Sequence, residues 1–203
     1  MKQEEKTERT KSRIFDAAMK EFGANGYTAG SINNICKTGI NKGLIYHNFK
    51  NKDELYLECV AKSCREMISC IKERGATEGF VEYMNARKEF FSEHEAEACI
   101  FLEARTNPPH SLAEPIGEIY AEFDELNRLV LEKELSKHTL RKGVSKEDAM
   151  KYFSAMQKLY NLDFLKGVQE KMPPHDQLEL HELNIYKIFD FMLYGIAEGG
   201  EKS

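Results

Sequence analysis

The chain has 203 residues, of which 41% are hydrophobic and 31% are charged, a composition typical of a folded protein with one domain or two small ones. No apolar run approaches the roughly 18 residues that a membrane span requires. The first ten residues are rich in charge and lack the apolar stretch of a signal peptide. These observations exclude a membrane-spanning class and predict a cytoplasmic protein.

The cysteines are odd in number and include no C-x-x-C pair. We interpret them as reduced and mostly buried thiols, with a redox-active member among them as the alternative. They are Cys36, Cys59, Cys64, Cys70 and Cys99.

Charge is unevenly distributed along the chain. Residues 1–52 contain ten Lys and Arg against five acids, a net charge of +5, whereas the whole chain carries −5, which leaves −10 on the remainder. A basic end on an acidic body is expected when only that end meets nucleic-acid phosphates. The mixed-sign N-terminal residues are interpreted as a solvated end, with a DNA-contacting arm as the alternative.

Apolar residues at helical spacing predict three short helices in the N-terminal region, over about 7–22, 31–37 and 42–49. Glycine-containing turns separate them, and Thr38-Gly39-Ile40 joins the second to the third. Two short helices joined by a tight turn with glycine are typical of a helix-turn-helix, whose second helix enters the major groove.

The same spacing continues to the end of the chain, and no strand pattern is evident. Cap-like patterns that begin at Asn51, Ser111 and Ser145 and proline pairs at 108–109 and 173–174 set the boundaries. The six predicted helices run over about 51–74, 78–92, 95–106, from 111 to before Gly143, from 145 to beyond Tyr160, and 177–197. We therefore predict an all-α fold of about nine helices.

The last predicted helix is apolar around well over half of its circumference. A terminal helix of this kind must be buried on two sides, against the core and against another chain. This pattern predicts a homodimer formed through the eighth and ninth helices.

The third helix carries the candidate DNA contacts. Asn41 is a suitable N-cap, and Gly43 lets the backbone approach DNA closely. The apolar Ile45 and Phe49 face the core, which leaves the other side chains on the outside. These outward residues are Lys42, Leu44, Tyr46, His47 and Asn48. A generic helical hairpin with a solvated basic face is the alternative interpretation.

The stretches G-Y-T-A-G-S-I-N-N-I and G-I-N-K-G-L-I-Y-H-N-F-K-N-K-D-E-L-Y closely resemble the DNA-binding region of the TetR family, over about residues 10–57. The resemblance implies a homodimer, with a helix-turn-helix domain at residues 1–50 and a six-helix ligand-binding and dimerisation domain at 51–203. It also implies that Ser31, Tyr46, His47 and Lys52 contact the DNA backbone. Leu44 and Asn48 match positions at which the family varies its groove contacts.

Two features depart from the family pattern. The turn I-C-K-T-G-I is one residue shorter than usual, so the second helix is expected to end early. Leu44 replaces a frequent Thr or Ser, which favours contact with a thymine methyl. Both departures leave the operator sequence open.

Aromatic and methionine side chains are abundant in the helical body. Each alone is interpreted as core, whereas together they suit an apolar pocket with a few polar groups. The candidate ligand-binding residues are Phe80, Met84, Phe91, Phe101, Tyr120, Phe123, Tyr152, Met156 and Tyr160. Possible metal ligands occur at His94, Glu97 and Cys99 and at His175, Asp176 and His181, but neither set has a recognised spacing, so we expect no metal site.

The sequence thus predicts a DNA-binding transcriptional regulator, with repression favoured over activation. It binds a two-fold-symmetric operator as a homodimer and is released by a small, largely apolar effector. No nucleophile elbow or phosphate-binding glycine loop is present, so we expect no enzymatic activity and no cofactor. An all-α enzyme and a helical adaptor that binds only protein are the alternatives. The effector, the operator and the regulated genes are not determined by the sequence.

Overall fold

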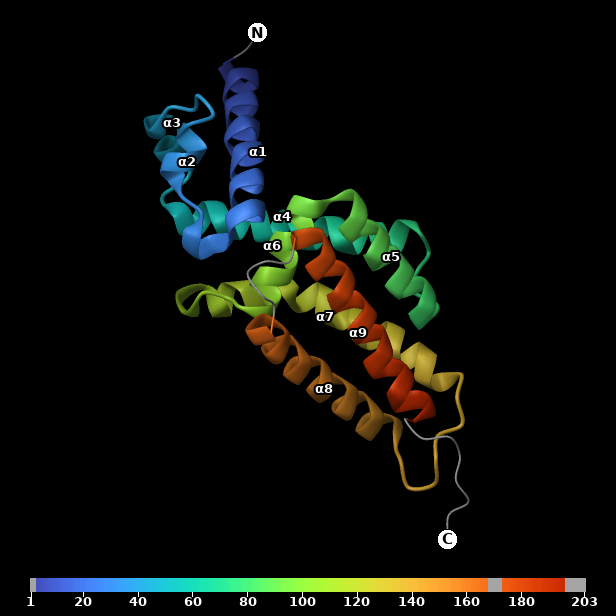
Figure 1. The fold of residues 1–203 in the computed structure, drawn as a ribbon. Helices are drawn as coiled ribbons and strands as arrows, with labels where there is room; N and C mark the ends of the chain where they lie inside the picture. Colours follow the sequence, from blue (N-terminus) through green and yellow to red (C-terminus); the bar gives the residue numbers. More distant parts are fainter. Residues whose placement is uncertain (1–2, 168–172, 196–203) are drawn as a thin grey trace.

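The computed structural model describes residues 3–167 and 173–195, and all regular structure in these ranges is helical (Figure 1). No described helix is both long enough and apolar enough to cross a bilayer. The elements are α1 (Gln3–Ala29), α2 (Ile32–Cys36), α3 (Lys42–Asn48), α4 (Lys52–Glu73), α5 (Phe80–Glu93), α6 (Glu95–Thr106), the 3₁₀ helix His110–Leu112, α7 (Ala113–Ser136), α8 (Lys146–Gly167) and α9 (Pro174–Tyr194). The all-α prediction is confirmed.

Helix α1 is longer than predicted: Gly23 lies within it, and Gly26 kinks it before its last residues. It continues past Phe22 and Gly23 to Ala29, with non-helical dihedral angles at Gly26 (φ 65°). A Cβ at Gly23 would lie 2.8 Å from atoms of Ala96, so this glycine permits close packing of α1 on α6. The early glycines therefore serve helix contact and a kink rather than termination.

Caps decide where several later helices begin. Asn51 accepts a hydrogen bond from the Glu54 backbone N–H at 2.8 Å and starts α4 as predicted. Ser145 and Asp148 form the reciprocal pair that starts α8, with the Asp148 N–H donating to Ser145 Oγ at 3.0 Å. The predicted cap at Ser111 is wrong, since a 3₁₀ turn covers this residue and α7 begins at Ala113 without a side-chain cap.

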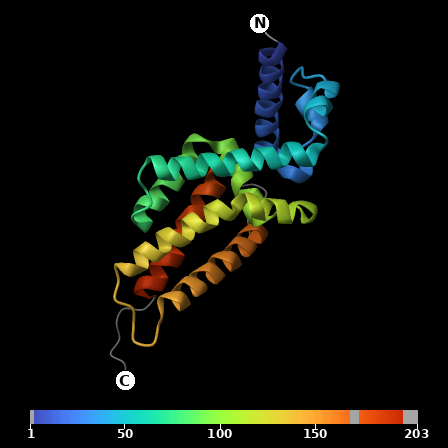
Figure 2. The ribbon, with the colours of Figure 1, turned by 180° about the vertical axis from the view of Figure 1, so that it is seen from behind.

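The helices form a small head and a larger body. Helices α1–α3 pack together at one end of the molecule, and α5–α9 form the bundle at the other end (Figures 1 and 2). Helix α4 runs from the head across the body, as Figure 2 shows clearly. Helix α6 also packs against both α1 and α4, so two helices join the head to the body. The ninth helix is predicted to end at Ala197, and the last two residues of that predicted range lie outside the described residues.

All five cysteines are free thiols, three of them buried and two partly buried. Burial raises the pKa of Cys64 to about 12 and that of Cys99 to about 11. A thiol is nucleophilic as the thiolate, so these two sites favour the unreactive form.

Candidate nucleic-acid interface and ligand cavity

Each short helix of the head starts at a capped residue. The Ser31 hydroxyl accepts from the Asn34 backbone N–H at 3.3 Å, and Asn41 Oδ1 accepts from the Gly43 N–H at 2.7 Å. Between the helices, Gly39 has a φ of 86°, a left-handed conformation that lets the short turn close. The short turn therefore shortens α2, which ends at Cys36, and leaves the helix-turn-helix intact.

Helix α3 has an inner face and an outer face. Ile45 and the C-capping Phe49 are buried in the core of the head, as the sequence predicts. Leu44 and Tyr46, which are large and partly apolar, are 46% and 48% exposed. His47 is also exposed, and its neighbour Asn48 is half-buried. Because the side chains of Leu44 and Tyr46 face solvent, they are accessible to another molecule.

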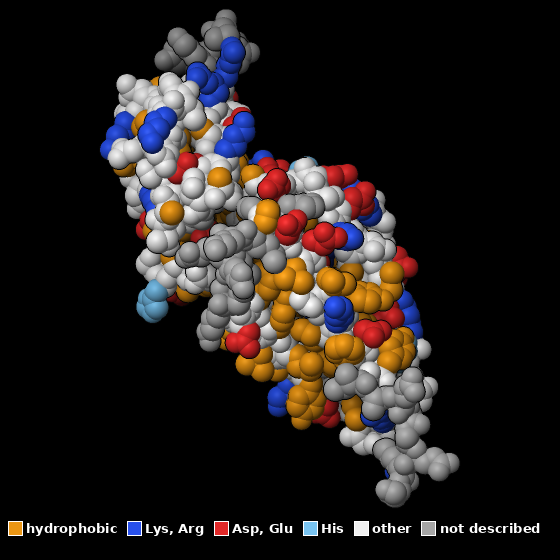
Figure 3. Space-filling model, in the orientation of Figure 1, with side chains coloured by type: hydrophobic (Ala, Val, Ile, Leu, Met, Phe, Trp, Pro, Cys, Tyr) orange, Lys and Arg blue, Asp and Glu red, His pale blue; other side chains and the backbone are white. Residues whose placement is uncertain are grey.

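The polar candidates are positioned by neighbouring residues. Lys42 Nζ donates to Asn33 Oδ1 at 3.0 Å, which joins the start of α3 to α2. The Asn48 side-chain amide donates to the Leu44 carbonyl at 2.8 Å. The Lys52 ammonium lies 4.3 Å from the centre of the Tyr27 ring. All three side chains remain on the surface of the head, where Figure 3 shows Lys and Arg side chains gathered.

Sequence reasoning missed Glu21, which holds α2 in place. Its Oε1 accepts from the Ser31 backbone N–H at 3.0 Å and from the Asn34 side-chain amide at 2.8 Å. The sequence feature that could have pointed to Glu21 is the presence of an acidic residue in a mostly basic region. By tying α1 to the start of α2, Glu21 fixes the angle at which the helix-turn-helix is presented.

The family model for bacterial regulatory proteins of the tetR family matches residues 14–59, which span the core of α1 through the first part of α4. The N-terminal region of the chain therefore matches the TetR family. A curated relative is the HTH-type transcriptional regulator UidR of Escherichia coli K12, which is 29% identical over 105 residues. That match covers 49% of this chain and 54% of UidR, so the chain matches about half the length of its curated relatives.

Solved structures share the whole fold. The regulator FadR from Bacillus subtilis, in complex with stearoyl-CoA, is 20% identical and covers 92% of this chain and 99% of its own, with a TM-score of 0.59. A TetR-family regulator from Agrobacterium tumefaciens is 15% identical and covers 89% of this chain and 97% of its own, with a TM-score of 0.63. The predicted all-α architecture, with a helix-turn-helix head on a helical body, is thereby confirmed over residues 3–167 and 173–195.

The body contains a cavity of about 630 Å³ between α5, α7 and α8. Its inner wall is largely apolar and includes Phe80, Met84, Val130, Leu131, Phe153 and Ile185. Its outer rim includes Asp124, Arg128 and Lys158, which are exposed, so the cavity opens to solvent between α7 and α8. A cavity of this size and lining suits a small, largely apolar molecule.

Two of the nine predicted ligand-binding residues, Phe80 and Met84, line this cavity. Phe91 lines a smaller hollow between α5 and α9. Phe101, Tyr120 and Phe123 do not line it; they pack on one another in the core between α6 and α7, with the Phe101 ring centre 5.1 and 5.0 Å from the other two.

The three candidate ligand-binding residues on α8 do not line the cavity. Tyr152 and Met156 are 63% and 39% exposed and point away from the core. Tyr160 is half-buried and accepts a hydrogen bond from the Asn184 side-chain amide at 3.1 Å. Helical spacing alone did not show which side of α8 meets α7 and α9.

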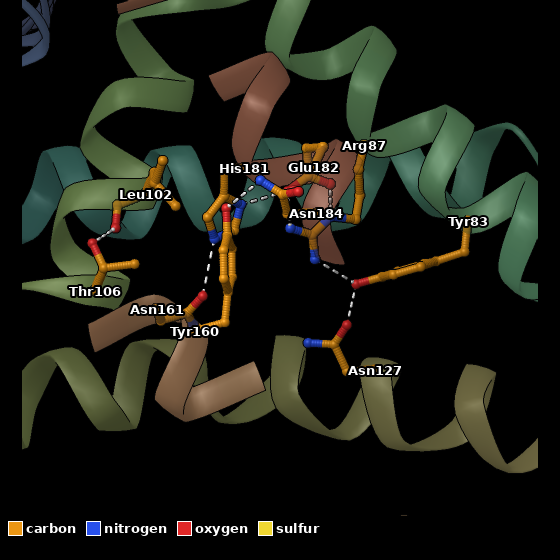
Figure 4. Close-up of polar contacts among 10 residues, drawn as sticks. All are labelled: Tyr83, Arg87, Leu102, Thr106, Asn127, Tyr160, Asn161, His181, Glu182 and Asn184. Atoms are coloured by element: carbon orange, nitrogen blue, oxygen red, sulfur yellow. Dashed lines mark hydrogen bonds and ion pairs between the residues drawn. The ribbon is translucent and has the colours of Figure 1, made fainter. Parts of the chain in front are cut away.

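A buried polar network borders the cavity and was missed by sequence reasoning (Figure 4). Arg87 of α5 donates through Nε and Nη2 to the two carboxylate oxygens of Glu182 of α9, at 2.7 and 2.6 Å. Arg87 Nη1 also donates to the Tyr83 hydroxyl at 3.0 Å, and that hydroxyl donates to Asn127 Oδ1 of α7. The sequence feature that could have revealed this network is a charged residue on an otherwise apolar face of α5 and of α9.

His181 extends the network to α8. Its Nδ1 lies 3.0 Å from Glu182 Oε1, and its Nε2 lies 2.9 Å from Asn161 Oδ1. His181 was considered as a metal ligand together with His175 and Asp176, but both of its nitrogens face acceptors within the network (Figure 4). Burial by itself would raise the pKa of Glu182, but Arg87 and His181 hold that pKa at about 2.

A second cluster joins the body to the head. Glu103 of α6 accepts from the Tyr27 backbone N–H at 2.9 and 3.1 Å and from the Tyr56 hydroxyl at 3.0 Å. The Tyr27 hydroxyl donates to Asp53 Oδ1 at 2.7 Å, next to Lys52 at the start of α4. Burial raises the pKa of the Glu103 carboxyl, against the hydrogen bonds that lower it. Since Arg105 and Thr106 of the same helix line the cavity, α6 touches both the cavity and the head.

Proposed function

We propose that this chain is a DNA-binding transcriptional regulator of the TetR family, acting as a repressor that a small, largely apolar effector releases from its operator. The observation that carries this proposal is the capped recognition helix α3, which presents Leu44, Tyr46 and His47 to solvent on a head with a net charge of +5. Residues 1–50 would bind DNA and residues 51–203 would bind effector and partner, without enzymatic activity. We place the protein in the cytoplasm, where operator DNA lies.

The DNA contacts follow from the geometry of the head. Leu44 and Asn48 lie on α3 where they would face base edges, with the Leu44 methyls suited to a thymine methyl. Lys42, Gly43, Tyr46 and His47, together with Ser31, Asn41 and Lys52 at the helix starts, would contact the DNA backbone. In a homodimer, two copies of α3 would read two half-sites one helical turn apart.

The effector site we propose is the cavity between α5, α7 and α8. Its inner wall is apolar, and α6, which lines part of it, reaches the head through Glu103. The fold neighbour FadR from Bacillus subtilis was solved with stearoyl-CoA, a molecule that has a long apolar chain. A ligand that moves α6 or α4 would change the separation of the two recognition helices.

The DNA-binding proposal is tested by selecting double-stranded DNA from a random library with the purified protein and titrating the selected sequence at several salt concentrations. Each phosphate that the protein neutralises should add roughly −0.9 to the slope of log affinity against log salt. Lys42→Ala should flatten the slope by about one unit and weaken binding to all sequences. The matched control is Lys88→Ala, an exposed lysine on α5 that should leave the slope unchanged. Selection of no sequence, or binding independent of salt, would contradict the proposal.

A further inference from the structure

The cavity offers no uncompensated buried charge. The buried Arg87 is paired with both oxygens of Glu182, and each side chain of this pair is only 4% exposed. Arg105 is paired with Asp124 at 2.5 and 3.0 Å. Arg128 is paired in the same way with Glu125 and Glu132. Lys158 has no ion pair within the described residues, but it is exposed to water at the rim. A charged ligand group at the inner end would therefore lose its hydration without gaining a counterion.

The inner end does offer hydrogen-bond donors, and their direction is fixed. A guanidinium can only donate, so the Tyr83 oxygen accepts from Arg87 and the Tyr83 proton goes to Asn127 Oδ1. This arrangement leaves the Asn127 amide nitrogen as the free end of the chain of bonds. That nitrogen makes no hydrogen bond to another described residue, and in Figure 4 it points away from Tyr83. Asn127 lines the cavity, so its N–H groups are available to a ligand.

We infer that the effector is an uncharged amphipathic molecule whose carbonyl-type oxygen accepts a hydrogen bond from the Asn127 amide. The Arg87–Tyr83–Asn127 chain of bonds begins at a cation, which polarises the terminal N–H and strengthens it as a donor. The alkyl part of the ligand would lie along the apolar wall near Phe80, Met84 and Phe153. This inference rests on the proposed effector function and adds the ligand class: amides, esters, ketones or lactones rather than carboxylates or amines.

The test compares four eight-carbon acyl or alkyl probes by isothermal titration calorimetry with the full chain at about pH 7.5. Methyl octanoate and octanamide are neutral acceptors, whereas octanoate is an anion and octylammonium a cation at this pH. The two neutral probes should bind at least about tenfold more tightly than either ion, because an ion must lose its hydration. Tighter binding of octanoate or octylammonium would overturn the inference and leave the proposed effector function standing. Failure of all four probes to bind would overturn both.

Three variants locate the interaction. Asn127→Leu removes the donor and should reduce the preference for the neutral probes to roughly threefold or less. The matched control Gln157→Leu changes another amide of the same cavity wall and should keep the preference. Glu182→Gln frees the charge of Arg87 and should shift the preference toward octanoate. If Glu182→Gln does not fold, the comparison of Asn127→Leu with Gln157→Leu still tests the inference. Equal loss of the preference for neutral probes in these two variants would contradict a role for Asn127.

Discussion

Arg87 and Glu182 form a charge pair that is almost fully removed from solvent. A buried pair of this kind is weak evidence of net stabilisation, because the loss of hydration offsets the attraction. Its geometry nevertheless constrains the fold: two parallel hydrogen bonds lock α5 to α9, and Tyr83 extends the lock to α7. We therefore regard the pair as a device that fixes how three helices of the body meet.

Loss of one member of the pair should cost more than loss of both. Arg87→Met or Glu182→Leu alone leaves a buried charge without a partner and should lower the free energy of unfolding by about 3–5 kcal/mol. The double variant replaces both charges with apolar groups and should be clearly more stable than either single variant. Urea unfolding followed by circular dichroism measures all three. A double variant with the summed loss of the two single variants would contradict this account.

The pair also predicts how stability depends on pH. The folded-state pKa of Glu182 is about 2, below the ordinary value of 4.5, so the unfolded chain takes up a proton first. The stabilisation from the ionised carboxylate is therefore complete above about pH 4.5 and is lost as the pH falls toward 2. The difference in stability between the wild type and Glu182→Gln should shrink over this window, and a constant difference would contradict the assignment.

At single positions, the sequence predicted the helix caps better than the ligand cavity. Asn41, Asn51 and Ser145 act as caps because a cap depends on residues within one turn. Whether Phe101 lies in the core or lines the cavity depends instead on how α6 packs against α7, which no local pattern encodes. The same limit explains why the network around Arg87 was missed, since its partner lies 95 residues away.

Helix α6 connects the cavity to the head, since Arg105 and Thr106 line the cavity and Glu103 accepts a hydrogen bond from the Tyr27 backbone. Helix α4 also joins the head to the body, and its apolar spacing predicted it over nearly its full length, from Asn51 to about Arg74. The contact between α1 and α6 was not foreseen, since the early glycines were interpreted as the end of a helix. In the structure they are the means of close packing, and Gly26 also makes room for the Glu103 carboxylate.

Glu103→Gln should loosen this connection. The amide retains one acceptor oxygen but loses the charge that strengthens the bonds from Tyr27 and Tyr56, so stability should fall by about 1–3 kcal/mol. The backbone amide of Tyr27 should exchange its hydrogen faster, which hydrogen–deuterium exchange measures directly. Glu97→Gln is the matched control, because Glu97 lies on the same helix but pairs with Lys62 of α4. Equal exchange at Tyr27 in the two variants would show that Glu103 does not restrain the head.

At the scale of the whole molecule, α8 and α9 share a large exposed apolar surface. We call it the α8–α9 surface; its exposed members are Tyr152, Met156, Leu159, Leu162, Leu183, Tyr186, Phe191 and Tyr194. Figure 3 shows hydrophobic side chains gathered over these two helices. So many large apolar side chains in one contiguous area are unusual on a monomer. The sequence predicted an apolar ninth helix but not which residues face inward: Phe189 is buried and stacks on Phe80 at 3.8 Å, whereas Phe191 is 45% exposed.

We expect the α8–α9 surface to form a two-fold interface, so that each protomer contributes the same two helices to a four-helix contact. Leu159 is 64% exposed at this surface, and Leu159→Glu should place two like charges in the interface and dissociate the dimer. Light scattering after size-exclusion chromatography should give twice 23.4 kDa for the wild type at micromolar concentration and 23.4 kDa for the variant, with helical circular dichroism unchanged.

Leu129→Glu is the matched control, since Leu129 is 42% exposed on α7, outside this surface, and its variant should remain a dimer. Phe189→Glu should instead lose helical structure, because it puts a charge into the core. A wild-type chain that runs as a folded monomer would refute the interface. It would also refute the proposal that two copies of α3 in a dimer bind two half-sites.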